Sequence, residues 1–173
     1  AKRPFIVNIA DKAFELEVLG TEFNMQAYAT DEFVNTILVK GSVRLAMETT
    51  SGNRKTVVLE PSQKANYNPA KQNLHIVPVN PIYETAWIEG KIMFKDTPLP
   101  EVLNRLSHFY NVHFQIEDQV INQYTFTGVF EQRHLTQVLD YLSISSQIKY
   151  KIIVPEEDDS KEVKQTYVIL TRR

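Results

Sequence analysis

The chain has 173 residues, of which 43% are apolar and 23% are charged, and its formal net charge is −2. This composition is typical of a globular protein with one or two domains. The near-neutral charge, without a long basic run, excludes nucleic acid and anionic lipid as expected partners. The absence of cysteine excludes disulfides, thiolate metal sites and a cysteine nucleophile.

No apolar run approaches the roughly 18 residues that a membrane helix needs. The first residues lead directly into a strand-like segment, FIVNI at 5–9, whereas a signal peptide would contain a longer apolar stretch. We therefore expect the chain to be an excised, soluble portion of a longer protein.

Alternation of apolar and polar residues predicts a series of short strands between residues 4 and 80. Turn signals such as SGN at 51–53 separate these segments. Many short strands at this spacing favour an all-β, sandwich-like domain. The segments are FELEV (14–18), FNMQAY (23–28), FVNTILVKGSVRLAM (33–47), KTVVLE (55–60), ANY (65–67) and LHIVPV (74–79).

Pro78 and Pro81 interrupt this pattern, and a sequence of different character follows them. We therefore predict a β domain over residues 1–83 and a second domain over residues 84–173.

The second half contains one phrase twice, FKDTPLPEVLNRLSHFYNVHFQI at 94–116 and FEQRHLTQVLDYLSISSQIKYKI at 130–152. In each copy, apolar residues at helical spacing precede an alternating segment, so each unit is predicted to be strand, helix and strand. Two such units favour an α+β domain with helices over a mixed sheet. The predicted strands are 87–94, 112–116, 124–130, 148–154 and 166–171, and the predicted helices are 98–110 and 134–144.

Strand parity assigns roles to several residues of this second domain. Trp87 and Met93 share one face of the predicted strand at 87–94, away from the helices, so we expect them to pack between the two domains. Other residues of outward parity form a mostly polar face beside sheet edges that accept a partner strand. These candidate partner-binding residues are Thr125, Thr127, Val129, Lys149, Lys151 and Ile153.

The sequence offers little for catalysis. No GxSxG, HExxH, GxxxxGK[ST] or GxGxxG motif is present, so we expect no enzyme and no cofactor. His108 and His113 are five residues apart and straddle a predicted helix end, which does not suit a metal pair on one helix face. The acidic run at 156–159 lacks the spacing of a calcium loop, and we expect a solvated turn and no metal site.

Gly20-Thr21 lies between two predicted strands and allows two interpretations. In the first, the glycine supplies a backbone conformation that other residues resist. In the second, the Thr21 hydroxyl attacks the Gly20 carbonyl and gives an ester that hydrolyses, so that the chain cleaves itself.

Five segments together resemble the FecR-type transmembrane anti-sigma regulators of Gram-negative bacteria, particularly those of Bacteroidetes. They cover nearly the whole chain, and their order and spacing are more specific than any one of them. One departure is Ser62, where the family usually has glycine in an L-x-P-G turn. The segments are VLGTEFNMQAY (18–28), LVKGSVRL (38–45), LEPSQKANYN (59–68), TAWIEGKIMFKDTPLPEVLNRLSHFYNV (85–112) and YTFTGVFEQRHLTQVLDYLS (124–143).

The resemblance implies a periplasmic sensor of a single-pass inner-membrane protein, with a FecR β-domain followed by a domain similar to the secretin and TonB short N-terminal fold. Its expected partner is the N-terminal signalling domain of a TonB-dependent outer-membrane transporter. An extracytoplasmic-function sigma factor would bind a cytoplasmic domain outside this chain, and a membrane helix would also lie outside it. Some members cleave themselves at a Gly-Thr bond, which strengthens the second interpretation of Gly20-Thr21 while the first stays open. The alternative is a free-standing periplasmic module that binds a glycan or another small ligand.

Overall fold

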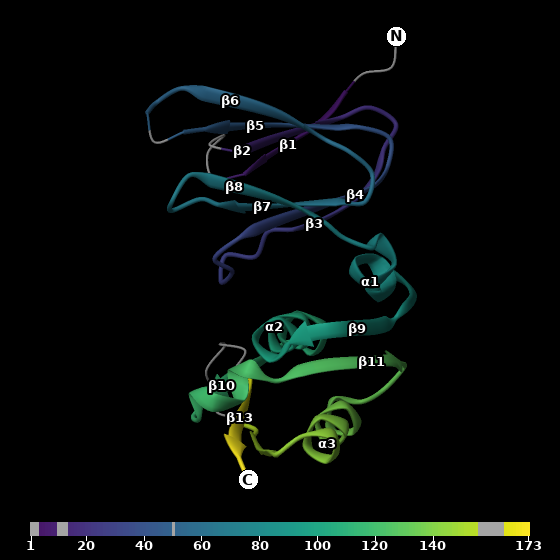
Figure 1. The fold of residues 1–173 in the computed structure, drawn as a ribbon, viewed down its shortest axis with the longest axis vertical. Helices are drawn as coiled ribbons and strands as arrows, with labels where there is room; N and C mark the ends of the chain where they lie inside the picture. The colour runs from purple at the N-terminus through teal and green to yellow at the C-terminus, as the bar shows by residue number, and fades with distance from the viewer. Residues whose placement is uncertain (1–3, 10–13, 50, 156–164) are drawn as a thin grey trace. The chain divides into compact units, whose positions relative to one another are not determined.

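The computed structural model describes residues 4–9, 14–49, 51–155 and 165–173. The chain divides into two compact units, Ala1–Thr85 and Ala86–Arg173 (Figure 1). The boundary expected between residues 83 and 84 falls inside a short helix, α1 (Pro81–Thr85). The acidic run at 156–159 lies outside the described residues.

The first unit contains two four-stranded sheets, in which every neighbouring pair of strands is antiparallel (Figure 1). One sheet has the order β1-β2-β5-β6 and the other the order β3-β4-β7-β8. The first consists of β1 (Phe5–Ile9), β2 (Phe14–Val18), β5 (Val43–Glu48) and β6 (Arg54–Leu59). The second consists of β3 (Glu22–Gln26), β4 (Val34–Lys40), β7 (Gln63–Asn68) and β8 (Asn73–Pro78).

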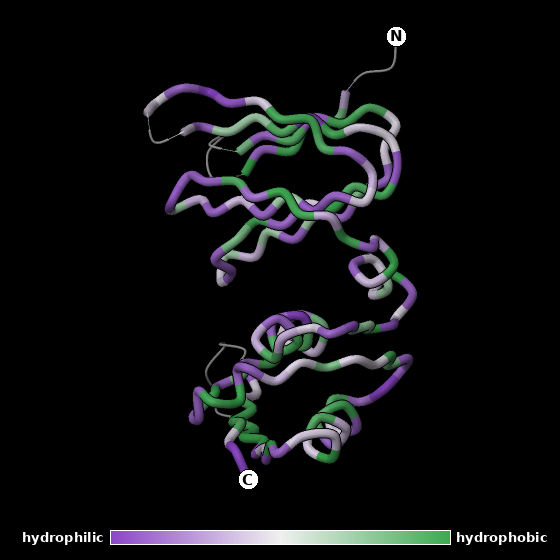
Figure 2. The backbone as a smooth tube through the Cα atoms, in the orientation of Figure 1, coloured by the Kyte–Doolittle hydropathy of each residue, from purple (hydrophilic) through white to green (hydrophobic). Residues whose placement is uncertain are grey.

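Alternate residues of the two sheets form one shared core. Hydrophobic and hydrophilic residues follow one another along these strands (Figure 2). Phe14 of β2 stacks on Tyr67 of β7 with ring centroids 4.6 Å apart, which joins the sheets. The expected β-sandwich is therefore present. Its buried core residues are Phe14, Leu16, Val18, Val34, Leu38, Val43, Leu45, Met47, Leu59, Ala65 and Tyr67.

The chain passes from one sheet to the other after β2, after β4 and after β6. Each of these connections contains a residue with positive φ: Gly20 at 65°, Gly41 at 95° and Ser62 at 66°. The connections also touch, because a Cβ on Gly41 would lie 2.7 Å from Thr21 Cγ2 and the Ser62 amide donates to the Leu38 carbonyl at 2.9 Å. Sharp turns at one end of the sandwich thus gather these three segments.

Helix α1 packs on the face of β4 that points away from the sandwich core. Asn80 accepts a hydrogen bond from the Ile82 amide at 3.1 Å, and Pro81 occupies the first helical position. Asn24 donates to the Glu84 carbonyl at 3.4 Å, and Lys64 Nζ lies 3.3 Å from Glu84 Oε2. These two contacts of Glu84 anchor the end of α1 to the strands of the β unit.

The second unit begins with a 3-10 helix and continues with two strand-helix-strand units. Its elements are η1 (Ala86–Glu89), β9 (Lys91–Pro98), α2 (Leu99–Tyr110), β10 (Val112–Ile116), η2 (Gln119–Gln123), β11 (Thr125–Glu131), α3 (Leu135–Ser145), β12 (Ile148–Ile153) and β13 (Thr166–Arg172). None of the helices in the described ranges is long and apolar enough to cross a membrane.

The strands of this unit form two sheets, where the sequence predicted one mixed sheet. β9 pairs with β11 in an antiparallel pair. β13 lies between β10, to which it is parallel, and β12, to which it is antiparallel. The expectation of a single sheet is wrong because the strands of each repeat belong to different sheets. The first strands of the two repeats, β9 and β11, pair with each other, whereas the second strands, β10 and β12, both pair with β13.

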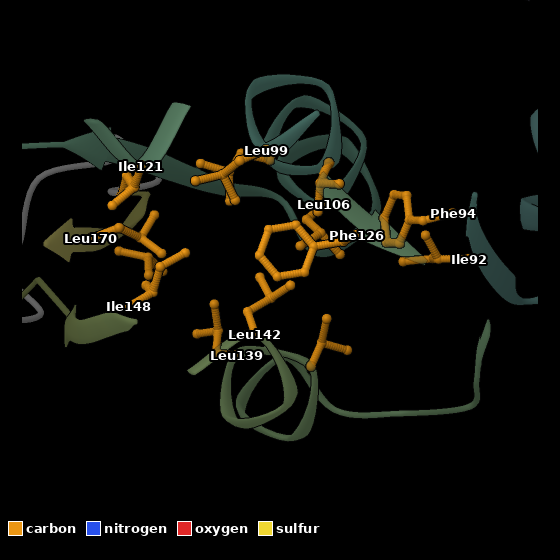
Figure 3. Close-up of a cluster of buried hydrophobic side chains, with 14 of the residues drawn as sticks. Ile92, Phe94, Leu99, Leu106, Ile121, Phe126, Leu139, Leu142, Ile148 and Leu170 are labelled. Carbon is orange, nitrogen blue, oxygen red and sulfur yellow. The ribbon is translucent and has the colours of Figure 1, made fainter. Parts of the chain in front are cut away.

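Both helices contribute to one core between the strands (Figure 3). The predicted stripe of α2 is buried, and α2 ends at Asn111, which has φ 53° and donates its amide to the Ser107 carbonyl. In α3, Leu135 is only partly buried. The buried helix residues are Leu99, Val102, Leu103 and Leu106 of α2, and Val138, Leu139 and Leu142 of α3.

Trp87 does not lie in a strand, contrary to the sequence prediction. It belongs to η1, and Gly90, with φ 71°, separates η1 from β9. The shared strand parity of Trp87 and Met93 is therefore wrong, since Met93 alone is in a strand. The Trp87 side chain is 54% exposed, and its contact with the β unit stays a prediction.

Candidate functional sites

The Gly20-Thr21 bond lies in the first connection between the two sheets of the β unit. Gly20 is exposed and adopts a left-handed conformation, as the structural interpretation of this glycine requires. Thr21 Oγ1 is buried and has no hydrogen-bond partner among the described residues. Its hydroxyl is therefore not held by a competing hydrogen bond.

The turn at Gly41 packs closely against this bond. No role for Gly41 was expected from the sequence. A Cβ at position 41 would lie 3.2 Å from Thr21 Cα and 3.4 Å from the Gly20 carbonyl oxygen. Only glycine permits this approach without displacing Thr21. The motif LVKGSVRL contains Gly41, but the sequence does not reveal that its turn packs against Gly20-Thr21.

All six candidate partner-binding residues are exposed, but they do not lie on one sheet. Three of them are on β11, which pairs with β9, and three are on β12, which pairs with β13. The β11 residues are Thr125, Thr127 and Val129, and the β12 residues are Lys149, Lys151 and Ile153.

Thr127 is already engaged in an irregularity of its own sheet. The register of β9 and β11 shifts between Phe126 and Gly128, and Asp96 opposite has φ 49°. Thr127 Oγ1 accepts from the Asp96 amide at 2.8 Å and lies 3.3 Å from Asp96 Oδ1. Val129, 59% exposed, is thus the more available of these two side chains.

The β12 residues belong to an exposed face of the three-stranded sheet. Ile153 pairs with Tyr167 of β13, and Tyr167 pairs with His113 of β10. The His113 and Tyr167 rings meet edge to face with centroids 5.1 Å apart. Lys149 and Lys151 add positive charge to this face, and the sequence analysis did not include its two rings.

A hollow of about 300 Å³ lies beside β11, where the chain turns into α3. Its lining residues are Gly128, Val129, Phe130, Arg133, Gln137 and Tyr141. Tyr110 of α2 donates its hydroxyl to the Arg133 carbonyl at 2.7 Å and holds the turn in place. Burial raises the pKa of Tyr110, so this hydroxyl remains a donor at neutral pH. Of these residues, only Val129 was a candidate from sequence.

No group of three or more histidine and carboxylate side chains suited to a metal gathers in the described part of the chain. Tyr150 of β12 donates to Asp140 Oδ1 of α3 at 2.6 Å, and this bond is the main cause that raises the Tyr150 pKa. The bond ties the second strand-helix-strand unit together.

Comparison with known proteins gives a family match for part of the second unit and a fold for the chain. Residues 91–159 match the family model described as FecR, C-terminal. Two crystal structures of a candidate anti-sigma factor from Parabacteroides distasonis superpose on this chain with TM-scores of 0.73 and 0.72. They are 24% and 23% identical to it, covering 98% and 99% of this chain and 72% of that protein. No curated protein matches the sequence.

Proposed function

We propose that this chain is the sensor region of a FecR-type anti-sigma regulator and that it binds the signalling domain of a transporter. The family match over residues 91–159 and the fold shared with an anti-sigma factor structure support the first part of the proposal. The family is regulatory rather than catalytic. In the proposal, the partner is the N-terminal signalling domain of a TonB-dependent outer-membrane transporter. The chain would lie in the periplasm and relay the loaded state of that transporter through a membrane helix to an extracytoplasmic-function sigma factor.

The observation that carries the proposal is the exposed strand surface inside the matched region. β11 pairs with β9 alone among the described strands, and β12 pairs with β13 alone. An unpaired edge can accept a strand from a partner, which draws affinity from main-chain hydrogen bonds and specificity from adjacent side chains. Val129 and Ile153 supply exposed apolar area next to these edges.

Calorimetric titration of the cognate signalling domain into the whole chain tests the proposal. Val129→Asp and Ile153→Asp each place a charge where the partner would bury an apolar side chain, and the variant with the larger loss identifies the sheet that binds. We expect at least about tenfold weaker binding for that variant, since a buried unpaired charge costs more than about 1.4 kcal/mol.

Val58→Asp is the matched control, because Val58 is 56% exposed and Val129 is 59% exposed, but Val58 lies on β6 of the other unit. Its binding should stay within about twofold of the unchanged chain. Unchanged binding in both test variants together with a large loss in Val58→Asp would move the site to the β unit and contradict the proposal.

A second proposal concerns Gly20-Thr21, and the buried, unpartnered hydroxyl of Thr21 favours it. The hydroxyl oxygen attacks the Gly20 carbonyl carbon, the peptide C–N bond breaks, and the hydroxyl proton passes to the Thr21 nitrogen. Water then hydrolyses the resulting ester, which leaves a Gly20 carboxylate and restores the Thr21 hydroxyl. The products are two fragments that end and begin at these residues.

Mass spectrometry of the purified full-length protein tests this reaction. Thr21→Val keeps the shape of the side chain without the nucleophile and should give only intact chain, whereas Thr21→Ser keeps the hydroxyl and should still cleave. Fragments from Thr21→Val would exclude the reaction, as would intact unchanged protein after prolonged incubation.

A further inference from the structure

The hollow beside β11 has two apolar walls that other contacts hold in place. The rings of Phe130 and Tyr141 meet edge to face, with centroids 5.1 Å apart and planes at 76°. Tyr141 donates its hydroxyl to the Thr127 carbonyl at 2.8 Å, and Phe130 also meets Phe94 edge to face. The walls are thus preorganised, which lowers the entropic cost of binding.

Glycine at position 128 leaves part of the hollow beside these two rings unfilled. A Cβ there would lie 3.4 Å from the Phe130 ring and 3.6 Å from the Tyr141 ring. Gly128 does not have positive φ, so the backbone does not require glycine at this position. The absent side chain leaves space beside the two rings.

The remaining polar groups of the hollow are hydrogen-bond donors. Arg133 is exposed, and in the described ranges no carboxylate lies within ion-pair distance of it. Gln137 Oε1 accepts from the His134 amide at 3.1 Å, which leaves the Gln137 NH2 group as a further donor. Among the residues that the structure describes, no acidic side chain lines the hollow.

We propose that this hollow binds a carboxylate attached to an apolar group. The planar guanidinium of Arg133 suits a carboxylate because it can donate two parallel hydrogen bonds. The apolar part of the ligand then lies against Phe130 and Tyr141. A compact phosphate would gain nothing from these rings, and a neutral apolar ligand would leave Arg133 unused.

Two kinds of ligand carry a carboxylate next to an apolar group. One is a free organic acid, and the other is an extended polypeptide in which an acidic side chain lies beside an apolar one. A hollow of about 300 Å³ is at the small end of ligand pockets and holds either. The inference does not rest on the transporter partner, because its site is defined by Arg133 and the two rings.

Nuclear magnetic resonance titration of the whole 20.0 kDa chain tests the inference with defined probes. Phenylacetate represents the free acid and phenylacetamide its neutral counterpart; the peptides acetyl-Val-Glu-Val-amide and acetyl-Val-Gln-Val-amide represent the polypeptide source. We expect the acids to shift the Gly128 amide and Arg133 side-chain resonances. Each neutral probe should bind at least about tenfold more weakly, as expected for loss of a charge-assisted hydrogen bond.

Three variants complete the experiment. Arg133→Gln keeps the main-chain carbonyl that Tyr110 binds, so it should fold normally and lose at least about tenfold in affinity for both acids. Arg172→Gln, an exposed arginine on β13, should leave the affinity unchanged. Gly128→Ala places a methyl group against both rings in the lining of the hollow and should weaken binding without changing the charge.

The outcomes separate clearly. Tighter binding of the glutamate peptide assigns the site to a polypeptide, and tighter binding of phenylacetate assigns it to a free acid; both support the inference. Equal affinity for acid and neutral probes, unchanged affinity in Arg133→Gln, or shifts confined to residues away from β11 and α3 would overturn it, whether or not the chain binds a transporter.

Discussion

Ser62 occupies a turn position where the backbone favours glycine. The turn joins β6 to β7, with Pro61 before Ser62 and a hydrogen bond from the Gln63 amide to the Glu60 carbonyl at 3.2 Å. Proline followed by a residue at φ 66° is the pattern of a type II turn. The departure from the family's glycine has therefore left the turn shape in place, with the strain at Ser62.

Ser62→Gly should stabilise the β unit. A left-handed conformation destabilises a residue with a Cβ by about 1–2 kcal/mol, and glycine avoids this cost. Glycine in turn lowers the free energy of unfolding by about 0.5–1 kcal/mol, because it gives the unfolded chain more conformational freedom. The net gain is about 0.5–1 kcal/mol, measurable by urea denaturation. Ser42→Gly is a suitable control, because Ser42 is exposed and does not have positive φ; an equal gain there would contradict the strain at Ser62.

Thr36 presents a buried hydroxyl to the core of the sandwich. Its side chain is 0% exposed, and Oγ1 has no hydrogen-bond partner among the described residues. A buried hydroxyl without a partner costs about 1–3 kcal/mol. The hydroxyl of Tyr67 is in the same situation, and burial raises its pKa, with the charge of Glu48 as a smaller cause.

Thr36→Val replaces this hydroxyl with a methyl group of nearly the same size. We expect the free energy of unfolding to rise by about 1 kcal/mol because the desolvation cost disappears while the shape is kept. Thr56→Val, at an exposed position of β6, serves as the control and should change stability by less than about 0.5 kcal/mol. A loss of stability in Thr36→Val would show that its hydroxyl has a partner in solution.

At the scale of elements, a largely buried ion pair joins α1 to β7. The side chains of Lys64 and Glu84 are 14% and 12% exposed, and their charged atoms are 3.3 Å apart. Lys71 and Glu32 form a shorter pair, at 3.0 Å, but their side chains are 66% and 59% exposed. Burial rather than distance should decide which pair matters, since solvent screens exposed charges.

Lys64→Met should therefore destabilise the β unit by about 2–3 kcal/mol, because it removes the cation that lies 3.3 Å from the largely buried Glu84 carboxylate. Lys71→Met should cost less than about 1 kcal/mol. Thermal denaturation of the two variants gives the comparison. Similar losses in both would mean that α1 does not depend on the pair.

The elements that could be predicted from sequence are those with strong local periodicity. The helix expected at 98–110 is α2 (Leu99–Tyr110), because four apolar residues at helical spacing face one core. Helix α1 was missed although its signals were present: Asn80 is a good cap and Pro81 a good first residue, but Pro78 and Pro81 were interpreted only as breaks. The strand predicted at Trp87 was wrong because Gly90 ends the preceding turn.

The hollow beside β11 could not be predicted in the same way. Arg133 and Tyr141 have no shared sequence pattern, and the turn from β11 into α3 decides that they line one space. Gly128 was the available signal, since an isolated glycine inside a strand often marks a close approach of another group.

For the whole molecule, the duplicated phrase predicted two strand-helix-strand units but not their pairing. The insertion of β13 between β10 and β12 joins segments far apart in the sequence, and no local pattern encodes it. The same limit applies to the sandwich, where alternation predicts strands but not the three crossings between its sheets.

Trp87 is the chain's single tryptophan, so its fluorescence reports on one site. If Trp87 packs against the β unit, its emission should shift to shorter wavelength in the whole chain relative to a fragment of residues 86–173, because the ring leaves water. Identical emission maxima in the two proteins would reject the interdomain role proposed for Trp87.

The boundary between the units can be tested with two pairs of fragments. Residues 84 and 85 make their hydrogen bonds within the first unit: Glu84 binds Asn24 and Lys64, and Thr85 Oγ1 donates to the Pro81 carbonyl at 2.9 Å. A fragment of residues 1–83 lacks these groups and loses the hydrogen bonds and the ion pair that they make, so it should be about 1–3 kcal/mol less stable than residues 1–85. The fragments of residues 84–173 and 86–173 should have equal stability, within about 0.5 kcal/mol, by urea denaturation.

Equal stability of the fragments 1–83 and 1–85 would place the boundary before α1. Failure of the fragment 86–173 to fold alone would show that the second unit depends on the first.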